Sequence, residues 1–349
     1  MASLFLCCAK AKLLLAPKGG EPRSPPLESP IAKCSAGIAA HLPRQVEVLA
    51  MTLKHSVIMR DCLRAGLVMR NKIFAYSQYF VPKHFFSALM GRLAACHIHW
   101  LKNYLIRRFI AKYSIDMRET IQENAESYAN FNQFFIRQLK PQLRPVATDP
   151  SGMVSPVDGS VAAIGHIRHN LLLQAKNQYF TLETLVGNDH QLAKTFAEGS
   201  FATLYLAPHN YHRVHMPLTG TLQHTLYVPG NLFSVNRITA DLIPNLYARN
   251  ERLITVFHTE AGPMAVIFVG ALIVGGIKTI WMPQPIRDKR IKIDHSSAGL
   301  VLPKGAELGH FQLGSTVLLL FCKEAIHWAP EMTAGHPLKF GQKIGNIAL

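Results

Sequence analysis

A serine that follows a glycine at the start of an apolar run is the first place in this sequence where unusual chemistry is possible. The pair is Gly314-Ser315, and the apolar run is Val317–Phe321. The Ser315 hydroxyl can attack the Gly314 carbonyl and convert the peptide bond into an ester. A base that removes the Ser315 α-proton then eliminates the ester and leaves dehydroalanine, whose hydrolysis gives a pyruvoyl group at a new N-terminus. The pair is a candidate for self-cleavage, although Gly-Ser-Thr before a strand is most often a turn.

Histidines elsewhere in the chain supply candidate acids and bases. His209, His212 and His215 lie between Pro208 and Pro217. The prolines favour an extended backbone, in which residues three apart face opposite sides of a strand. No cysteine or carboxylate stands close by in the sequence to complete a zinc set, so we predict no metal site. We expect the histidines to act as acid and base near neutral pH.

The elements that must position these residues form a β-rich region after Pro150. Short apolar runs punctuated by glycine, proline and asparagine predict its strands. The runs are Met153–Val157, Val161–Ile164, Phe201–Leu206, Leu253–Phe257 and Ala265–Val274, and Val317–Phe321 predicts a buried strand. Upstream, apolar residues recur at helical spacing over Leu89–Tyr113, and Ser127–Arg137 predicts a short helix whose phenylalanines anchor it in the core. We therefore predict an α+β fold, with a mostly antiparallel β domain and N-terminal amphipathic helices.

Composition points to a basic protein that lies on a membrane surface. The 349 residues carry a formal net charge of +16, and 49% of them are hydrophobic. No stretch reaches the roughly 20 apolar residues that span a bilayer. The basic helical segment with Trp100 and Tyr104 suits an anionic membrane interface, although packing on the protein's own core is the commoner fate of such a stripe. Without an aromatic-basic repeat, nucleic acid is not an expected partner.

Composition and hydrophobic pattern divide the chain into three parts. Residues 1–70 are a leader or extension of unknown role, with a proline- and glycine-rich stretch and few acidic residues. Residues 71–125 are the helical, membrane-associating region. Residues 126–349 are the β-rich catalytic domain. The six cysteines are scattered without a C-x-x-C pair, which indicates neither a disulfide framework nor a zinc site.

Five motifs in order resemble those of phosphatidylserine decarboxylase, a pyruvoyl-dependent family. They are Pro156-Val157-Asp158-Gly159, Tyr211-His212-Arg213-Val214-His215-Met216-Pro217, Phe233-Ser234-Val235-Asn236, Asn250-Glu251-Arg252 and Leu313-Gly314-Ser315-Thr316. The resemblance runs from about Tyr79 to the C-terminus. Two positions depart from the family pattern. Asn177 stands where the family has glycine, and His209-Asn210 stands where an Arg-Asp pair is common.

The resemblance implies a role for each site residue. Ser315 is the nucleophile that becomes the pyruvoyl group, His215 is the base that activates it, and Asp158 holds His215 in the correct tautomer. Cleavage between Gly314 and Ser315 gives a β chain, 1–314, and an α chain, 315–349, which stay associated. The pyruvoyl cofactor forms an imine with phosphatidylserine, carbon dioxide leaves, and His212 is the acid that completes the formation of phosphatidylethanolamine.

Two other function classes are compatible with part of the sequence. A lipid hydrolase could use Asp158, His215 and Ser315 as a triad, but the chain has no G-x-S-x-G nucleophile elbow. A non-catalytic basic lipid-binding protein would explain the charge but not the histidines. We expect a peripheral protein on the cytoplasmic face of a bacterial inner membrane, with the mitochondrial inner membrane as the alternative. The expected partners are the phosphatidylserine substrate, the anionic membrane and a second copy of the cleaved pair.

Overall fold

The computed structural model describes residues 64–348 except 176–177, 273–275, 287 and 313–314. The chain divides into two compact units, 1–71 and 72–349. The predicted leader therefore lies almost wholly outside the described residues. Gly314 also lies outside them, and only the backbone of Ser315 is described. The predicted boundary between residues 125 and 126 stays a prediction.

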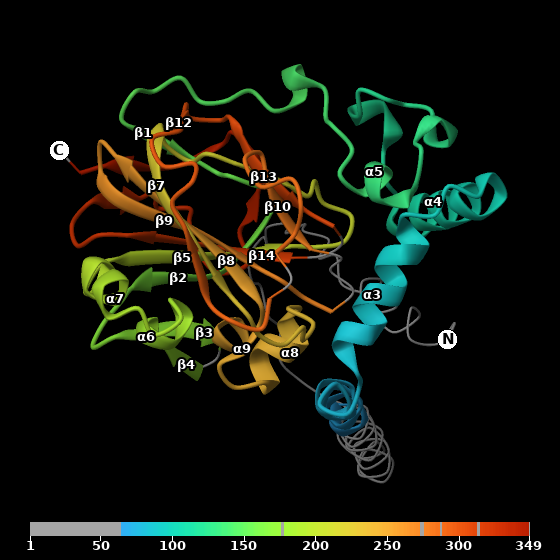
Figure 1. Ribbon diagram of the computed structural model, residues 1–349, viewed down its shortest axis with the longest axis horizontal. Coiled ribbons are helices and arrows are strands. Elements are labelled where there is room, and N and C mark those ends of the chain that lie inside the picture. The colour runs from blue at the N-terminus through green and yellow to red at the C-terminus, as the bar shows by residue number, and fades with distance from the viewer. Residues whose placement is uncertain (1–63, 176–177, 273–275, 287, 313–314, 349) are drawn as a thin grey trace, which may run out of the picture. The chain divides into compact units, whose positions relative to one another are not determined.

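Antiparallel strands make up most of the second unit (Figure 1). The largest sheet has nine strands, in the order β11-β7-β8-β9-β14-β5-β2-β16, with β12 also paired to β7. The smaller sheets have the orders β1-β17-β15, β10-β13-β6 and β3-β4. The strands are β1 (Gly152–Val154), β2 (Gly159–His166), β3 (Leu171–Ala175), β4 (Gln178–Thr181), β5 (Ser200–Leu206), β6 (Arg213–His215), β7 (Gly220–Val228), β8 (Arg252–Thr259), β9 (Gly262–Val269), β10 (Ile277–Thr279), β11 (Lys292–Asp294), β12 (Val301–Leu302), β13 (Glu307–Phe311), β14 (Ser315–Phe321), β15 (Ile326–Trp328), β16 (Pro337–Leu338) and β17 (Lys343–Ile347).

Strand β14 lies in the middle of the largest sheet. It pairs with β5 along its whole length, from Ser315 opposite Leu206 to Phe321 opposite Ser200, and with β9 on its other side. Because successive side chains of a strand point to opposite faces, Leu318 and Leu320 enter one hydrophobic core while Leu319 enters the other. Burial on both faces explains why the run is apolar without alternation, and it confirms the predicted buried strand.

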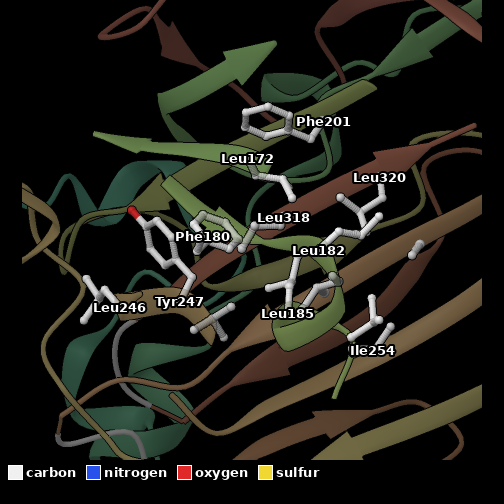
Figure 2. Packing of buried hydrophobic residues seen from close by; sticks show 14 of the residues in the cluster. Leu172, Phe180, Leu182, Leu185, Phe201, Leu246, Tyr247, Ile254, Leu318 and Leu320 are labelled. Carbon is white, nitrogen blue, oxygen red and sulfur yellow. The ribbon is translucent and has the colours of Figure 1, made fainter. Parts of the chain in front are cut away.

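The first core is covered by short helices on one face of the sheet (Figure 1). Leu318 and Leu320 share this core with Phe201 of β5, Ile254 of β8 and leucines from these helices (Figure 2). The helices are α6 (Leu182–Leu185), α7 (His190–Phe196), α8 (Arg237–Leu242) and α9 (Leu246–Arg249). Helices this short form mainly because their apolar side chains are buried, and capping side chains, such as Asp189 accepting from the Leu192 N–H, satisfy their ends.

The N-terminal part of the second unit is helical, as predicted. Its elements are α3 (Lys83–Ala94), α4 (His99–Tyr113), α5 (Phe131–Phe135) and the 3₁₀ turns η1 (Met117–Glu119), η2 (Ala125–Ser127) and η3 (Pro141–Leu143). Phe131, Phe134 and Phe135 of α5 form a third buried cluster with Ile106 of α4, which confirms the predicted core anchors. Asn130 caps α5 by accepting from the Gln133 N–H.

The helical run predicted over Leu89–Tyr113 is wrong in one respect, since two helices occupy it. Ile98 has an extended backbone between them, so α4 starts in a new direction (Figure 1). Ile106 of α4 packs with the phenylalanines of α5. Within the part of the chain that the structure describes, no helix has both the length and the apolar character that crossing a bilayer requires.

The α+β prediction is confirmed, and five of the predicted strands correspond to β1, β2, β5, β8 and β9. Two of these predictions were too long, because β1 ends at Val154 rather than Val157 and β9 ends at Val269 rather than Val274. The structure adds β7, which pairs with β8 over Gly220–Val228 and which the apolar runs did not predict. Polar residues alternate with apolar ones in β7, since one part of it faces solvent.

Replacing Leu318 with alanine should lower the free energy of unfolding by about 2–5 kcal/mol, because the side chain is fully buried and its loss leaves a cavity. The measurement is urea unfolding in a Ser315→Ala background, which is expected to keep the chain in one piece. Val301→Ala is the control, since Val301 is 59% exposed and should change the value by less than about 0.5 kcal/mol. An effect at Leu318 as small as that of the control would contradict the central position of β14.

Candidate active site

His215 lies at the end of β6 in a buried aromatic pocket. Its ring stacks on Phe340, with ring centroids 3.7 Å apart, and on Tyr211. Nδ1 is 2.9 Å from the carbonyl oxygen of Gly305, and Nε2 is 3.1 Å from the Tyr211 hydroxyl. Burial is the main reason that the pKa of His215 falls from 6.5 to about 4. The imidazole is therefore neutral at pH 7.

The hydrogen bonds of His215 determine which nitrogen carries its proton. A carbonyl oxygen can only accept, so Nδ1 must donate to Gly305. Nε2 is then unprotonated and accepts from the Tyr211 hydroxyl. Gly305 lies in a turn with φ +83°, a conformation that glycine adopts without strain, which directs its carbonyl at the ring. The nitrogen able to act as a base is Nε2.

Asp158 is held by an arginine and a backbone amide. Arg144 donates to both carboxylate oxygens, from Nε at 3.0 Å and from Nη2 at 2.7 Å, and the Phe340 N–H donates to Oδ1 at 2.8 Å. Arg144 also contacts Glu119 at 3.2 Å. Both members of the Arg144–Asp158 pair are buried, and the bidentate geometry compensates for their desolvation.

The structure brings Asp158 and His215 together without a hydrogen bond between them. Phe340 joins the two, because its N–H binds Asp158 while its ring stacks on His215. Among the described residues, the polar contacts of the His215 ring are Gly305 and Tyr211, so Gly305 occupies the position expected for Asp158. The charge of Asp158 still reaches His215 and raises its pKa, although burial outweighs this effect.

His212 lies in different surroundings from His215. It is fully buried and stacks on Phe135 of α5 at 4.1 Å. Neither ring nitrogen makes a well-formed hydrogen bond to the described residues. Burial, together with the nearby charge of Arg137, lowers the pKa of His212 to about 3, against a smaller opposing effect of backbone carbonyls. The ring is therefore neutral and enclosed by the protein.

Backbone pairing places the start of β14 beside the histidine segment. Ser315 is opposite Leu206, the last residue of β5, and the Phe311 N–H at the end of β13 donates to the carbonyl of His212. The backbone of Ser315 therefore lies next to the end of the strand that leads into the histidine segment.

The other two motifs contribute to the structure rather than to the pocket. The Asn250 side chain accepts from the Phe233 N–H and donates to the carbonyls of Phe233 and Gly270. Arg252 is buried and donates to four backbone carbonyls, and burial lowers its pKa to about 10. Asn236 caps α8 by accepting from the Thr239 N–H. These polar side chains therefore join strands and helices.

Sequence reasoning missed three residues that shape the site: Arg137, Arg144 and Tyr211. Two arginines on either side of Pro141, shortly before Asp158, were a usable signal, because acidic residues are scarce in this chain and buried ones need a cation. Tyr211 belongs to the histidine motif, and only the fold shows that its hydroxyl reaches His215. Of the two departures from the family pattern, Asn177 lies outside the described residues, and the His209 carbonyl accepts from Arg137 at 3.0 Å.

The chain is similar over most of its length to phosphatidylserine decarboxylases. Residues 131–346 match the phosphatidylserine decarboxylase family, and residues 73–114 match a family described as PSD. Similar proteins include phosphatidylserine decarboxylase proenzymes of Ectopseudomonas mendocina, 47% identical over 286 residues, and of Azotobacter vinelandii, 44% identical over 286 residues. Each match covers 80% of this chain and 100% of the relative. A proenzyme of Pseudomonas fluorescens is 45% identical over 282 residues, which is 79% of this chain and 98% of the relative.

The neutral histidines should make the protein less stable in mild acid. Both pKa values lie below the 6.5 of an unfolded histidine, so the unfolded chain binds more protons once the pH falls below about 6.5. Between pH 7.5 and 5.0 each histidine should reduce the free energy of unfolding by about 2 kcal/mol, a loss that levels off below its folded pKa.

Urea unfolding of the Ser315→Ala chain at both pH values measures this loss, with and without His215→Gln. The His215→Gln variant should lose about 2 kcal/mol less than its parent between the two pH values. His258→Gln, which changes an exposed histidine, is the control and should behave like the parent. Equal pH dependence of parent and His215→Gln would show that His215 is not held neutral.

Proposed function

The chain belongs to the phosphatidylserine decarboxylase family, and from this premise we propose how its own residues make and serve the catalytic group. The protein is a carboxy-lyase that converts phosphatidylserine into phosphatidylethanolamine and carbon dioxide. The observation that carries this function is the 47% identity to a proenzyme that is matched over 100% of its length. The cofactor of the family is a pyruvoyl group. Such a group accepts the electron pair of the carbon–carbon bond that breaks when carbon dioxide departs.

We assign Ser315 as the source of the pyruvoyl group. Pairing with β5 and β9 would hold the new N-terminus in place after cleavage, because seven consecutive residues of β14 are tied to β5. The serine begins a strand whose neighbour β5 leads directly into the histidine segment, which supports this assignment. Cleavage would give the chains 1–314 and 315–349, and β14 would keep the shorter chain bound.

His215 is proposed as the base for self-cleavage. Its Nε2 takes the Ser315 hydroxyl proton as Oγ bonds to the Gly314 carbonyl carbon, and the proton then passes to the departing Ser315 nitrogen. The Tyr211 hydroxyl must leave Nε2 for this to happen, while Gly305 keeps the tautomer fixed. Asp158 stabilises the transient positive charge through space, since its oxygens are bound to Arg144 and Phe340.

His212 is proposed as the acid that delivers a proton to the carbon from which carbon dioxide has left. A ring whose pKa is about 3 is neutral at pH 7, so it must first take up a proton. An anionic substrate that offsets the charge of Arg137 would favour this step, because that charge is one cause of the low pKa.

The helical part is proposed to lie on an anionic membrane, at the cytoplasmic face of a bacterial inner membrane. Trp100 is 70% exposed, Tyr104 is 57% exposed, and both line a groove of about 460 Å³ together with Arg107 and Arg108. Tryptophan and tyrosine favour the headgroup region of a bilayer, where arginine meets anionic lipids. The bacterial sources of the relatives favour this membrane over the mitochondrial one. A dimer of the cleaved pair remains a prediction.

The assignment of Ser315 is tested by the intact mass of the purified, denatured protein. Wild type should give two chains that meet at Gly314, the smaller without a free amino group, while Ser315→Ala should give one full-length chain. His215→Gln should slow the cleavage by about 10²–10⁴-fold, because the reaction loses its base. Ser296→Ala changes an exposed serine and should be cleaved like wild type.

A wild-type chain that stays whole would remove the self-made cofactor from the proposal. If that chain also reacted with a serine-directed phosphonate, a lipid hydrolase would become the favoured function instead of the decarboxylase. A whole, unreactive chain that binds lipid would favour the non-catalytic protein.

Membrane binding is tested by sedimentation with vesicles that contain phosphatidylglycerol. The double variant Trp100→Ser/Tyr104→Ser should bind roughly tenfold or more weakly. Burying each ring in the interface contributes at least about 1 kcal/mol to the free energy of binding. Ile293→Ser with Val301→Ser removes exposed apolar side chains of the β part and is the matched control. Equal losses in the two double variants would mean that the helices are not the contact surface.

A further inference from the structure

Arg137 is a buried cation whose hydrogen bonds are incomplete. It follows α5 and is only 5% exposed. Nη2 donates to the His209 carbonyl at 3.0 Å, and the guanidinium lies 5.5 Å from the centre of the Phe134 ring. Nε and Nη1 are buried without a hydrogen-bond acceptor among the described residues. A buried guanidinium with unused donors requires an acceptor from elsewhere.

A pocket of about 230 Å³ opens beside Arg137, and its carboxylates have partners already. Asp158 and Glu119 are bound to Arg144, and Asp116 is bound to Arg118. Burial lowers the pKa of Arg137. The charges of Asp158 and Glu119 act through space in the opposite direction, but their effect is smaller. Within the described ranges, no carboxylate forms an ion pair with Arg137. Asp158 and Glu119 share Arg144, so the charge of Arg137 balances the second of these carboxylates, while its Nε and Nη1 donors stay open to an acceptor.

The pocket belongs to the proposed active site. Asp158 and Tyr211 line it together with Arg137, and the charge of Arg137 reaches His212. Its volume suits a phospholipid headgroup without the acyl chains. An anion bound to Arg137 would thus lie next to the residues proposed for the chemistry.

The substrate offers two anions, the serine carboxylate and the phosphodiester, and the reaction distinguishes them. The carboxylate loses its charge as carbon dioxide leaves, so an arginine that binds it would stabilise the ground state more than the transition state and slow the reaction. The phosphodiester is the same in substrate, transition state and product. Binding it positions the headgroup without opposing the chemistry.

We propose that Arg137 binds the phosphodiester of the phospholipid headgroup through the donors that the protein leaves unused. This inference rests on the proposed function of the same site and adds to it the residue that recognises the substrate. Arg137 acts on affinity and orientation, and the proton transfers are assigned to other residues.

The test uses the self-cleaved, full-length enzyme and a probe that is not turned over, glycerophosphoethanolamine. Calorimetry should show that Arg137→Met weakens binding of this probe by about 10- to 100-fold, the effect of losing hydrogen bonds to a charged group. In the Arg137→Met variant, the KM for phosphatidylserine should rise by a larger factor than kcat falls. Arg168→Met replaces an exposed arginine and should change neither quantity.

Other probes and a second variant decide what the pocket recognises. Ethanolamine, which lacks the phosphodiester, should bind wild type and Arg137→Met alike. Inorganic phosphate should bind wild type more weakly than the diester does, and equal affinity would overturn the headgroup assignment. If Arg137→Met does not fold, Arg137→Lys decides, since a lysine keeps the charge without the planar donors and should weaken binding by about 3-fold or more.

Wild-type affinity and KM in a folded Arg137 variant would overturn the inference. Intact mass separates this result from failure of the proposed function. Variants that are cleaved and decarboxylate the lipid with an unchanged KM contradict only the role of Arg137. A wild-type chain that is neither cleaved nor active contradicts the function itself.

Discussion

The two-sided burial of β14 is the constraint on which the site depends. A strand in the middle of an antiparallel sheet has neighbours on both edges and side chains in two cores, so its position is fixed more firmly than that of any edge strand. Ser315, the serine proposed for self-cleavage, is the first residue of that strand. Cleavage of the bond before it would therefore change the covalent structure without moving the strand, because the pairing that holds Ser315 lies entirely on its C-terminal side.

The site also combines buried groups that compensate for one another. Arg144 neutralises Asp158, while His212 and His215 are kept neutral by burial. No described carboxylate contacts Arg137, although its charge balances the two carboxylates that share Arg144. Its unused donors attract an acceptor, since the low polarity of the surroundings does little to screen the guanidinium. The donors proposed to bind the substrate are thus present before the catalytic group exists.

The sequence predicted the elements that depend on local pattern and not the contacts that depend on distant backbone. The apolar run from Val317 to Phe321 and the phenylalanines of α5 were recognisable because hydrophobic pattern reports burial directly. The grouping of Asp158, the histidines and Ser315 came from the family resemblance. The contact between His215 and Gly305 was not predictable, because any residue has a carbonyl and only the fold brings this one to the ring. The break at Ile98 had no glycine or proline to signal it.

The last part of the chain pairs with strands from several distant parts of the protein. Downstream of β14, the strands β15 and β17 form a sheet with β1, and β16 pairs with β2, so residues 315–348 contact the remainder of the protein in three sheet regions. A chain that begins at Ser315 could not be exchanged without breaking these strand pairings. An enzyme with a diffusible cofactor can be reloaded after its cofactor is damaged, whereas here one chain provides one cofactor, once. The working lifetime of the catalytic group is therefore the lifetime of the protein, and lost activity can be restored only by new synthesis.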